Sequence, residues 1–271
     1  MSKENKRELA SQLGVSRASL YYAPKQPQKD WSLKCRMEEI LRVHPGYGHK
    51  RLAIALGVNK KRTLRVMKLF GIQPYRRRGR RWRKPPCASE YVVQNLLMST
   101  VPMRPNHIWA TDFTEILWKG KKLYLATMMD LFTRTVTGFS ALTNHSVHLV
   151  IGSLFSGIHK HPAPEILHSD RGSEYTGKDM RIILELLGTK QSMSRAGCPW
   201  ENGYQESFYS QFKVDLGDPN RFSSLGELVY EIYRLIHSYN TDRIHTALRM
   251  PPQSFSLRYA TTQFLIPSNV S

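Results

Sequence analysis

Cysteine is scarce in this sequence. Cys35, Cys87 and Cys198 are the three cysteines among 271 residues; they lie far apart and none belongs to a C-x-x-C pair. An odd number of scattered cysteines favours neither a disulfide framework nor a cysteine-based zinc site. We therefore expect a protein of a reducing compartment.

Long apolar runs are absent as well. The longest apolar stretches, such as LVIGSLF, fall well below the roughly 18 residues that a membrane helix needs, and the N-terminal MSKENKRELA contains no apolar core of a signal peptide. We expect a cytoplasmic protein that is neither exported nor embedded in a membrane. Its 41% hydrophobic residues suffice for one sizeable core and one or two smaller ones.

Acidic residues are few in the first third of the chain. Residues 1–90 hold 23 Lys and Arg against 6 Asp and Glu, a net charge of +17, whereas residues 91–271 hold 17 against 15, a net charge of +2. So dense a positive charge on one segment indicates a polyanionic partner, most commonly nucleic acid. The alternative at this stage is a solvated basic surface.

The first basic segment, residues 6–22, has the pattern of a helix, a tight turn at Gly14 and a second helix that Ser16 would cap. This predicts a helix-turn-helix whose second helix would present Arg17 and Ser19 to a DNA major groove. A plain helical pair has the same pattern. The expected inward-facing residues are Leu9, Ala10, Leu13, Val15, Leu20 and Tyr21.

A second helical unit follows in residues 35–72, where three apolar stripes of helical period are separated by PGYG (45–48) and GVN (57–59). Two such units in series favour nucleic-acid binding more than either one alone. The third helix is strongly basic and would contact DNA. Its basic residues are Lys60, Lys61, Arg62, Arg65 and Lys68.

Residues 74–86, PYRRRGRRWRKPP, carry 7 basic residues among the nine from Arg76 to Lys84. Like charges at this density predict an extended arm that grips phosphates or enters a minor groove, with Trp82 able to stack on a base. A solubilising tether, or a localisation signal in a nucleated cell, would have the same composition. The basic residues of the arm are Arg76, Arg77, Arg78, Arg80, Arg81, Arg83 and Lys84.

From residue 103 the pattern changes to strands and helices. Three successive strands are predicted at 107–118, 121–130 and 134–142, followed by helices at 146–160, 178–188, 201–217 and 224–240, with short strands at 164–170 and 189–194 between them. This order specifies an α/β fold: a mixed sheet with helices on its faces, preceded by all-α units.

Three acids stand at informative places in this region. Asp112 lies in the middle of the first strand, Asp170 ends a short strand, and Glu206 lies on a helix, with 35 residues between it and Asp170. An acid in an apolar strand is costly unless positive charge meets it, and three carboxylates meeting in the crevice of an α/β sheet could bracket two divalent cations. Taken singly, each acid is better explained by a local turn or a solvated helix face than by a metal site.

Several ordered motifs resemble the DDE transposases of the insertion-sequence-three family, relatives of the retroviral integrases. The likeness extends from HPGYGHKRLA to HTALRMPPQSF and includes W-x-x-D-x-T (109–114), MDLFTR (129–134), HSDRGSEY (168–175), the stretch 192–213 and Y-N-x-x-R-x-H-x-x-L (239–248). The sequence departs at WENG (200–203), where many relatives have Tyr-Asp-Asn-Ala, and it lacks the zinc-binding H-H-C-C module of retroviral integrases.

The resemblance implies an RNase H-like core that performs two in-line displacements at phosphorus. The first frees a 3′-OH at the transposon end, and the second joins that hydroxyl to target DNA. Asp112, Asp170 and Glu206 would be the catalytic acids and the ligands of two Mg²⁺ or Mn²⁺ ions. We expect Asp112 to bridge both ions, Asp170 to bind the first and Glu206 the second.

The resemblance also suggests secondary sites and partners. Asn202 would orient DNA or a water molecule, or cap a helix, and Arg243 and His245 would touch DNA or serve packing. His168 is expected to be a core histidine, and Asp130 and Glu174 to support the metal ligands. Double-stranded DNA, both transposon ends and target, is the expected partner, bound in a bacterial nucleoid by at least a homodimer, with a first-frame helix-turn-helix protein as a further candidate.

We therefore predict four segments: a helix-turn-helix at 1–30, a second helical unit at 31–73, a basic linker at 74–101 and an RNase H-like catalytic core with a C-terminal helix at 102–271. Two alternatives remain on the sequence alone. One is a DNA-binding regulator with this fold and no chemistry, and the other is an RNase H-like nuclease without strand transfer.

Overall fold

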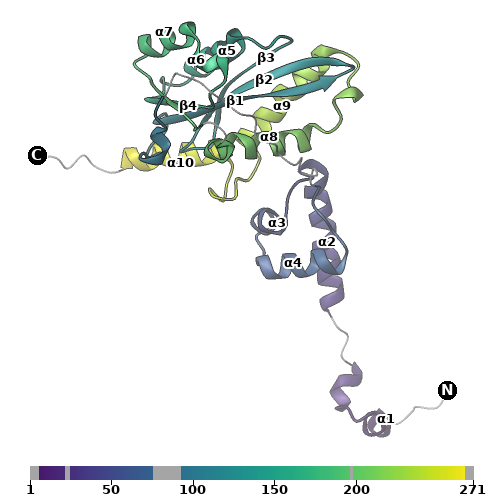
Figure 1. Ribbon diagram of the computed structural model, residues 1–271. Helices are drawn as coiled ribbons and strands as arrows, with labels where there is room; N and C mark the ends of the chain where they lie inside the picture. Colours follow the sequence, from purple (N-terminus) through teal and green to yellow (C-terminus); the bar gives the residue numbers. More distant parts are fainter. Residues whose placement is uncertain (1–5, 22–24, 76–92, 196–197, 266–271) are drawn as a thin grey trace, which may run out of the picture.

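The computed structural model describes residues 6–21, 25–75, 93–195 and 198–265. Figure 1 shows a sheet flanked by helices in the larger part and the N-terminal helices in a smaller body beneath it. The arm residues predicted to bind DNA at 76–84 lie outside the described ranges.

The first helical segment differs from its prediction. Helix α1 (Lys6–Gln12) and the turn at Gly14, with φ of 62°, are as expected, and Ser16 Oγ accepts a hydrogen bond from Ser19 N at 3.2 Å. The second helix, however, is η1 (Arg17–Tyr21), a 3₁₀ turn of five residues. Such a short piece cannot cover an apolar face, so Leu13 and Val15, predicted to face inward, are exposed by 59% and 44%.

The second helical unit has its breaks where they were predicted. Helix α2 (Gln26–Val43) ends before the turn 45–48, α3 (His49–Leu56) ends at Gly57 with φ of 65°, and α4 (Lys60–Leu69) begins where Asn59 Oδ1 accepts a hydrogen bond from Lys61 N. A left-handed glycine followed by an asparagine cap reverses the chain in three residues. The shared core contains Leu33, Met37, Tyr47, Leu52, Val66 and Met67.

The sheet has five strands in the order β3-β2-β1-β4-β5. Strand β1 (Ile108–Trp118) is antiparallel to β2 (Lys121–Asp130) through a turn with positive φ at Lys119 and Gly120, and β2 is antiparallel to β3 (Val136–Leu142). On the other side, β1 is parallel to β4 (Ile166–Ser169), which is parallel to β5 (Lys190–Met193). Crossover helices make these parallel pairings possible.

Helices cover both faces of the sheet, as Figure 1 shows. Helices α5 (Val147–Ile158), α6 (Ser173–Thr176) and α7 (Lys178–Leu186) pack around the fully buried Trp109 and Met128. Helices α8 (Gly203–Leu216) and α9 (Leu225–Thr241) pack over Leu125 and Ile116 on the opposite face. The 3₁₀ turns η2 (Leu96–Met98), η3 (Pro199–Asn202) and η4 (Pro219–Arg221) lie in the connections. The predicted α/β layering is therefore confirmed.

Helix α10 (Pro252–Leu265) was not among the predicted helices. It packs through the Phe255 and Tyr259 rings against Phe132, with ring centroids 5.7 and 4.9 Å apart. The helix begins at a proline, a residue that favours the first helical turn because its missing N–H would be unpaired there.

The turn 45–48 connects the helical unit to the core. Tyr47 is buried, and its hydroxyl oxygen accepts a hydrogen bond of 2.8 Å from Ile244 N. The Arg243 guanidinium lies over the Tyr47 ring, 5.6 Å from its centroid, and a Cβ added at Gly46 would lie 2.2 Å from Gln211 Nε2. Two motifs at opposite ends of the sequence, PGYG and the segment after α9, are therefore in direct contact.

Candidate active site

The three predicted acids come from three separate elements. Asp112 lies in mid-β1, Asp170 directly follows β4, and Glu206 lies in the first turn of α8. The parallel pairing of β1 with β4 matches Ala110 with His168, and continuing this register by two residues brings Asp170 level with Asp112. Side chains alternate along a strand, so Asp112 shares its face of β1 with Ile116, which packs under α8.

The charges of the acids act on one another. Burial and the negative charges of Asp170 and Glu206 together raise the pKa of Asp112 to about 7, while a hydrogen bond from Phe113 N and the charge of Lys213 oppose the rise. Burial also raises the pKa of Asp170, with a contribution from the charge of Glu174. Since both other acids influence Asp112, the structure brings the three carboxylates into one electrostatic neighbourhood. Their mutual repulsion is what a bound cation would relieve.

The carboxylates do not form a ready-made metal cage. Within the part of the chain that the structure describes, no group of three His, Cys, Asp or Glu side chains converges closely enough to hold an ion. The donor set nevertheless fits a hard divalent cation, because it consists of carboxylate oxygens only. Glu206 is exposed in the first turn of α8.

Two side chains of α8 that sequence reasoning missed hold this helix on β1. Gln205 Nε2 donates to Ala110 O at 2.7 Å, and the Tyr209 hydroxyl donates to Asp112 O at 2.6 Å. Both side chains are buried and also contact Thr127 of β2. The acceptors belong to Asp112 itself and to the residue two positions before it, and Glu206 lies between the two donors in sequence, so the bonds position the acid on the helix relative to the acid on the strand.

Asn202 occupies the N-cap position of α8 but makes no side-chain cap hydrogen bond. Its Nδ2 donates instead to Thr111 O at 3.2 Å, beside Asp112, and its Oδ1 is buried with no hydrogen-bond partner among the described residues. The capping alternative is therefore wrong. The Asn202 amide group joins the start of α8 to β1 through Nδ2, and its Oδ1 remains free to accept a hydrogen bond.

The three secondary residues expected near the site have different surroundings. His168 is a core histidine: it is fully buried, its Nδ1 is 2.9 Å from Ser192 Oγ, and burial lowers its pKa to about 4. Glu174 lies next to Asp170, and its Oε1 is 3.1 Å from His145 Nε2, which makes an ion pair when the histidine is protonated. Asp130 accepts hydrogen bonds from Phe132 N and Thr133 N at the β2–β3 turn and from Asn106 N ahead of β1, so it holds that turn and joins it to the segment before β1.

Some of the DNA-contact residues predicted in the helical segments are exposed, whereas others are bound to groups within the protein. Lys60 and Lys61 are exposed at the start of α4. Arg65 is bound to the buried Asp30 at 2.6 Å, and Arg62 Nη2 donates to Lys29 O at 3.5 Å. Arg65 therefore holds α4 to α2, because removing it would leave Asp30 buried without its cation. In the first segment, Arg17 is exposed, and Ser19 Oγ is 2.9 Å from Ser16 Oγ.

Arg243 and His245 lie in the segment after α9, where Arg243 is buried and His245 is half-buried. Arg243 is 4% exposed and its Nη1 forms an ion pair with Asp215 of α8. Burial, together with the charges of Arg134, Arg51 and Arg243, lowers the pKa of His245 to about 4. Both side chains face a cavity beside α8.

Comparison with known proteins identifies the class. Two integrase core domain models match residues 102–199 and 187–252. The chain is 32% identical over 231 residues to the transposase for insertion sequence element IS904 of Lactococcus lactis, covering 79% of this chain and 88% of that protein. It is 31% identical over 255 residues to the putative transposase InsK for insertion sequence element IS150 of Escherichia coli, covering 89% of each.

The fold has its counterpart among solved structures. A chain of the simian T-cell lymphotropic virus intasome, solved in complex with PP2A regulatory subunit B56 gamma, superimposes with a TM-score of 0.52 at 16% identity over 78% of this chain and 70% of that one. These findings define an RNase H-like polynucleotidyl transferase. The chain belongs to the DDE transposases of the insertion-sequence-three type, relatives of the retroviral integrases.

Membership of this family establishes the general activity. The protein is a DNA transposase of the DDE type, and enzymes with this core act with divalent metal ions. None of the helices in the described ranges is both long and apolar enough to cross a membrane.

Proposed function

We propose that Asp112, Asp170 and Glu206 are the catalytic acids and the ligands of two Mg²⁺ or Mn²⁺ ions. The observation that carries this assignment is the electrostatic coupling at Asp112, whose pKa is raised by burial and by the charges of Asp170 and Glu206. When bound, such ions activate the attacking oxygen and stabilise the leaving oxygen. Asp112 would be a ligand of both ions, Asp170 of one and Glu206 of the other.

The chain's own side chains prepare the site for a phosphodiester. Gln205 and Tyr209 attach α8 to β1, which fixes the backbone of Glu206 relative to Asp112. Asn202 Oδ1, buried and lacking a hydrogen-bond partner among the described residues, could accept a hydrogen bond from the attacking water or 3′-OH. Lys213, whose charge opposes the rise in the Asp112 pKa, offsets part of the negative charge between metal loadings.

The substrate in this proposal is the terminal inverted repeat of an insertion sequence, followed by target DNA. The unit 31–73 would hold the repeat through Lys60, Lys61 and Arg62 of α4, and the arm 74–101 would grip phosphates. The first segment, with Arg17, would add contacts or share that role with a first-frame partner. Because two ends must be cleaved and joined together, the active form would be at least a dimer.

The test is strand transfer in Mg²⁺ with a duplex that carries the element's terminal repeat. We expect Asp112→Asn to bind this duplex with nearly wild-type affinity and to lose cleavage and joining by at least about a thousandfold, since a neutral amide cannot hold the ions. Asp179→Asn, which neutralises an exposed acid of α7, is the matched control and should retain both activities.

Three results would contradict the proposal. Joining by Asp112→Asn above background would remove the metal role of this acid. Simple degradation by the wild-type protein would indicate a nuclease, and duplex binding with no cleavage would indicate a regulator.

A further inference from the structure

A cavity of about 460 Å³ lies beside the N-terminal half of α8, and arginines from three parts of the chain line it. Arg51 comes from α3 in the helical unit, Arg134 from the β2–β3 turn and Arg243 from the segment after α9. Tyr204 and Ser207, which flank Glu206 in sequence, form part of the opposite wall.

Five buried nitrogen atoms of residues that line the cavity have no hydrogen-bond partner among the described residues. Four are the guanidinium donors Arg51 Nε, Arg134 Nε, Arg134 Nη1 and Arg243 Nη2, and the fifth is His245 Nδ1, a donor in one tautomer of the ring. A buried polar group without a partner costs roughly 1–3 kcal/mol, and more when it is charged. Native structures therefore seldom leave such groups unpaired. Several unpaired nitrogen atoms on residues that line one cavity indicate that a hydrogen-bond acceptor is missing there.

The charge balance indicates that the acceptor is an anion. Among the described residues that line the cavity, none is an aspartate or a glutamate. Asp215, outside it, pairs with Nη1 of Arg243 and offsets one of the three guanidinium charges. The remaining positive charge acts on the neighbouring groups. Burial and then the charge of Arg243 lower the pKa of Arg51, and burial and then the charges of the three arginines lower the pKa of His245.

We propose that this cavity binds a phosphate group of a DNA strand, at a site separate from the three acids. Guanidinium groups match the geometry of phosphate oxygens with paired N–H donors. The Arg134 guanidinium is stacked on Tyr204, 4.0 Å from the ring centroid, an arrangement that leaves its N–H edge available for an in-plane acceptor. The identification of DNA as the source of the phosphate rests on the proposed function.

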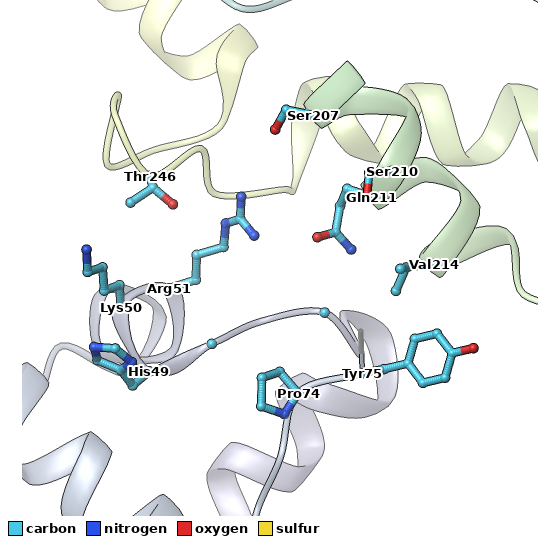
Figure 2. Close-up of a pocket in the computed structure, with 12 residues that line it drawn as sticks. His49, Lys50, Arg51, Pro74, Tyr75, Ser207, Ser210, Gln211, Val214 and Thr246 are labelled. Carbon is cyan, nitrogen blue, oxygen red and sulfur yellow. The ribbon is translucent and has the colours of Figure 1, made fainter. Parts of the chain in front are cut away.

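The surroundings suit a strand that continues past the phosphate. A second cavity of about 640 Å³ shares Arg51, Ser207 and Gln211 with the first and is lined by His49 and Lys50. Figure 2 shows Arg51 extending from the helical unit between Thr246 and Gln211, toward α8. Arg51 thus borders both spaces, and the two together form a basic path between the helical unit and the core.

The experiment uses the full chain and a duplex of the element's terminal repeat, with binding measured by fluorescence anisotropy over a range of salt concentrations. Arg134→Gln should weaken binding roughly tenfold at fixed salt and reduce the slope of log K against log salt by about one. Arg258→Gln, the matched control on the exposed face of α10, should leave both quantities unchanged. Near-ultraviolet circular dichroism verifies the fold, and Arg51→Gln serves as a second variant.

Methylphosphonate substitution along the duplex identifies the bound group. We expect one substituted position to weaken wild-type binding and to have no further effect in Arg134→Gln. Duplexes with and without a 5′-phosphate distinguish a terminal phosphate from an internal one, and either source supports the pocket.

Equal binding by Arg134→Gln, Arg51→Gln and Arg258→Gln would overturn the phosphate pocket. That result is distinguishable from failure of the proposed function. If the wild-type protein joins DNA ends and the arginine variants bind normally, the pocket is wrong and the transposase site stands. If the wild-type protein binds DNA through Arg134 but joins no ends, the pocket stands and the catalytic assignment fails.

Discussion

Asp112 illustrates how a single residue can contradict its surroundings for a functional reason. It stands in a strand whose neighbours Trp109 and Ala110 are fully buried, and burial together with two other acids raises its pKa to about 7. Such a group destabilises the protein in its charged form. This cost is consistent with a carboxylate whose charge is compensated only when a metal ion binds to it.

His245 gives a pH-dependent stability of predictable sign. Its pKa is about 4 in the folded protein, below the ordinary value of 6.5, because it is buried among Arg134, Arg51 and Arg243. The unfolded chain therefore binds the proton more readily, so the stability present above pH 6.5 is lost as the pH falls toward 4. We expect urea unfolding of the DNA-free protein to show this decline, at most about 1.4 kcal/mol per pH unit from this residue.

His245→Gln should show a shallower decline over the same pH range. His168, whose pKa is also about 4, remains in both proteins, so the difference between the two profiles isolates His245. Identical profiles would show that the pKa of His245 is not lowered in the folded protein.

The sequence predicted the three acids but not the residues that place them. Asp112, Asp170 and Glu206 could be singled out because carboxylates in or after apolar strands are unusual and because their spacing resembles a known family. Gln205 and Tyr209 could not, because a polar residue on an amphipathic helix is expected to face solvent. Their i, i+4 spacing was a usable signal, yet only the backbone carbonyls of β1 reveal why both are buried.

At the scale of elements, the contact between β3 and α5 depends on two glycines. A Cβ added at Gly138 would lie 2.3 Å from Ser153 O and 2.4 Å from Gly157 N, both backbone atoms of α5. A Cβ added at Gly157 would lie 2.8 Å from the Trp109 ring. The helix can approach the sheet this closely only where side chains are missing.

Gly138→Ala should therefore destabilise the protein by about 1–3 kcal/mol or more, because α5 must move away from the sheet. The matched control is Gly226→Ala in α9, where an added Cβ would meet Ser224 Oγ at an ordinary 3.8 Å. That change should leave stability unchanged or raise it by up to about 1 kcal/mol, as expected for alanine in a helix. Chemical denaturation measures both, and equal midpoints for the two variants would contradict the close packing.

The elements that sequence patterns predicted well are those with a clear period and clear ends. The strands around Asp112 and the helix carrying Glu206 belong to this group. The failures are η1, where Ser16 and Gly14 marked the turn correctly but five residues were too few for an α-helix, and α10, whose apolar residues follow no strong stripe. Periodicity indicates which face is apolar, whereas packing against a partner decides whether the element forms.

At the scale of the whole molecule, charge is concentrated in the first 90 residues, at +17 against +2 for the rest. Replacing Arg76, Arg77 and Arg78 together with glutamine should reduce the salt dependence of duplex binding by roughly three counterions, since each phosphate contact releases about one. Anisotropy titrations from low to moderate salt measure the slope. Neutralising three exposed cations of the core, Lys160, Arg249 and Arg258, is the control, and an unchanged slope in the arm variant would mean that the arm does not touch DNA.

The hydrogen bond between Tyr47 and Ile244 joins positions 197 residues apart. During synthesis the helical unit leaves the ribosome long before its partner segment exists, so it must wait, with Tyr47 uncovered, until nearly the whole polypeptide has been made. A chain that stops short of this segment would carry the basic helices without the last contact that seats them. Truncated products would consequently lack the contact between the turn 45–48 and the segment after α9 that the finished enzyme has.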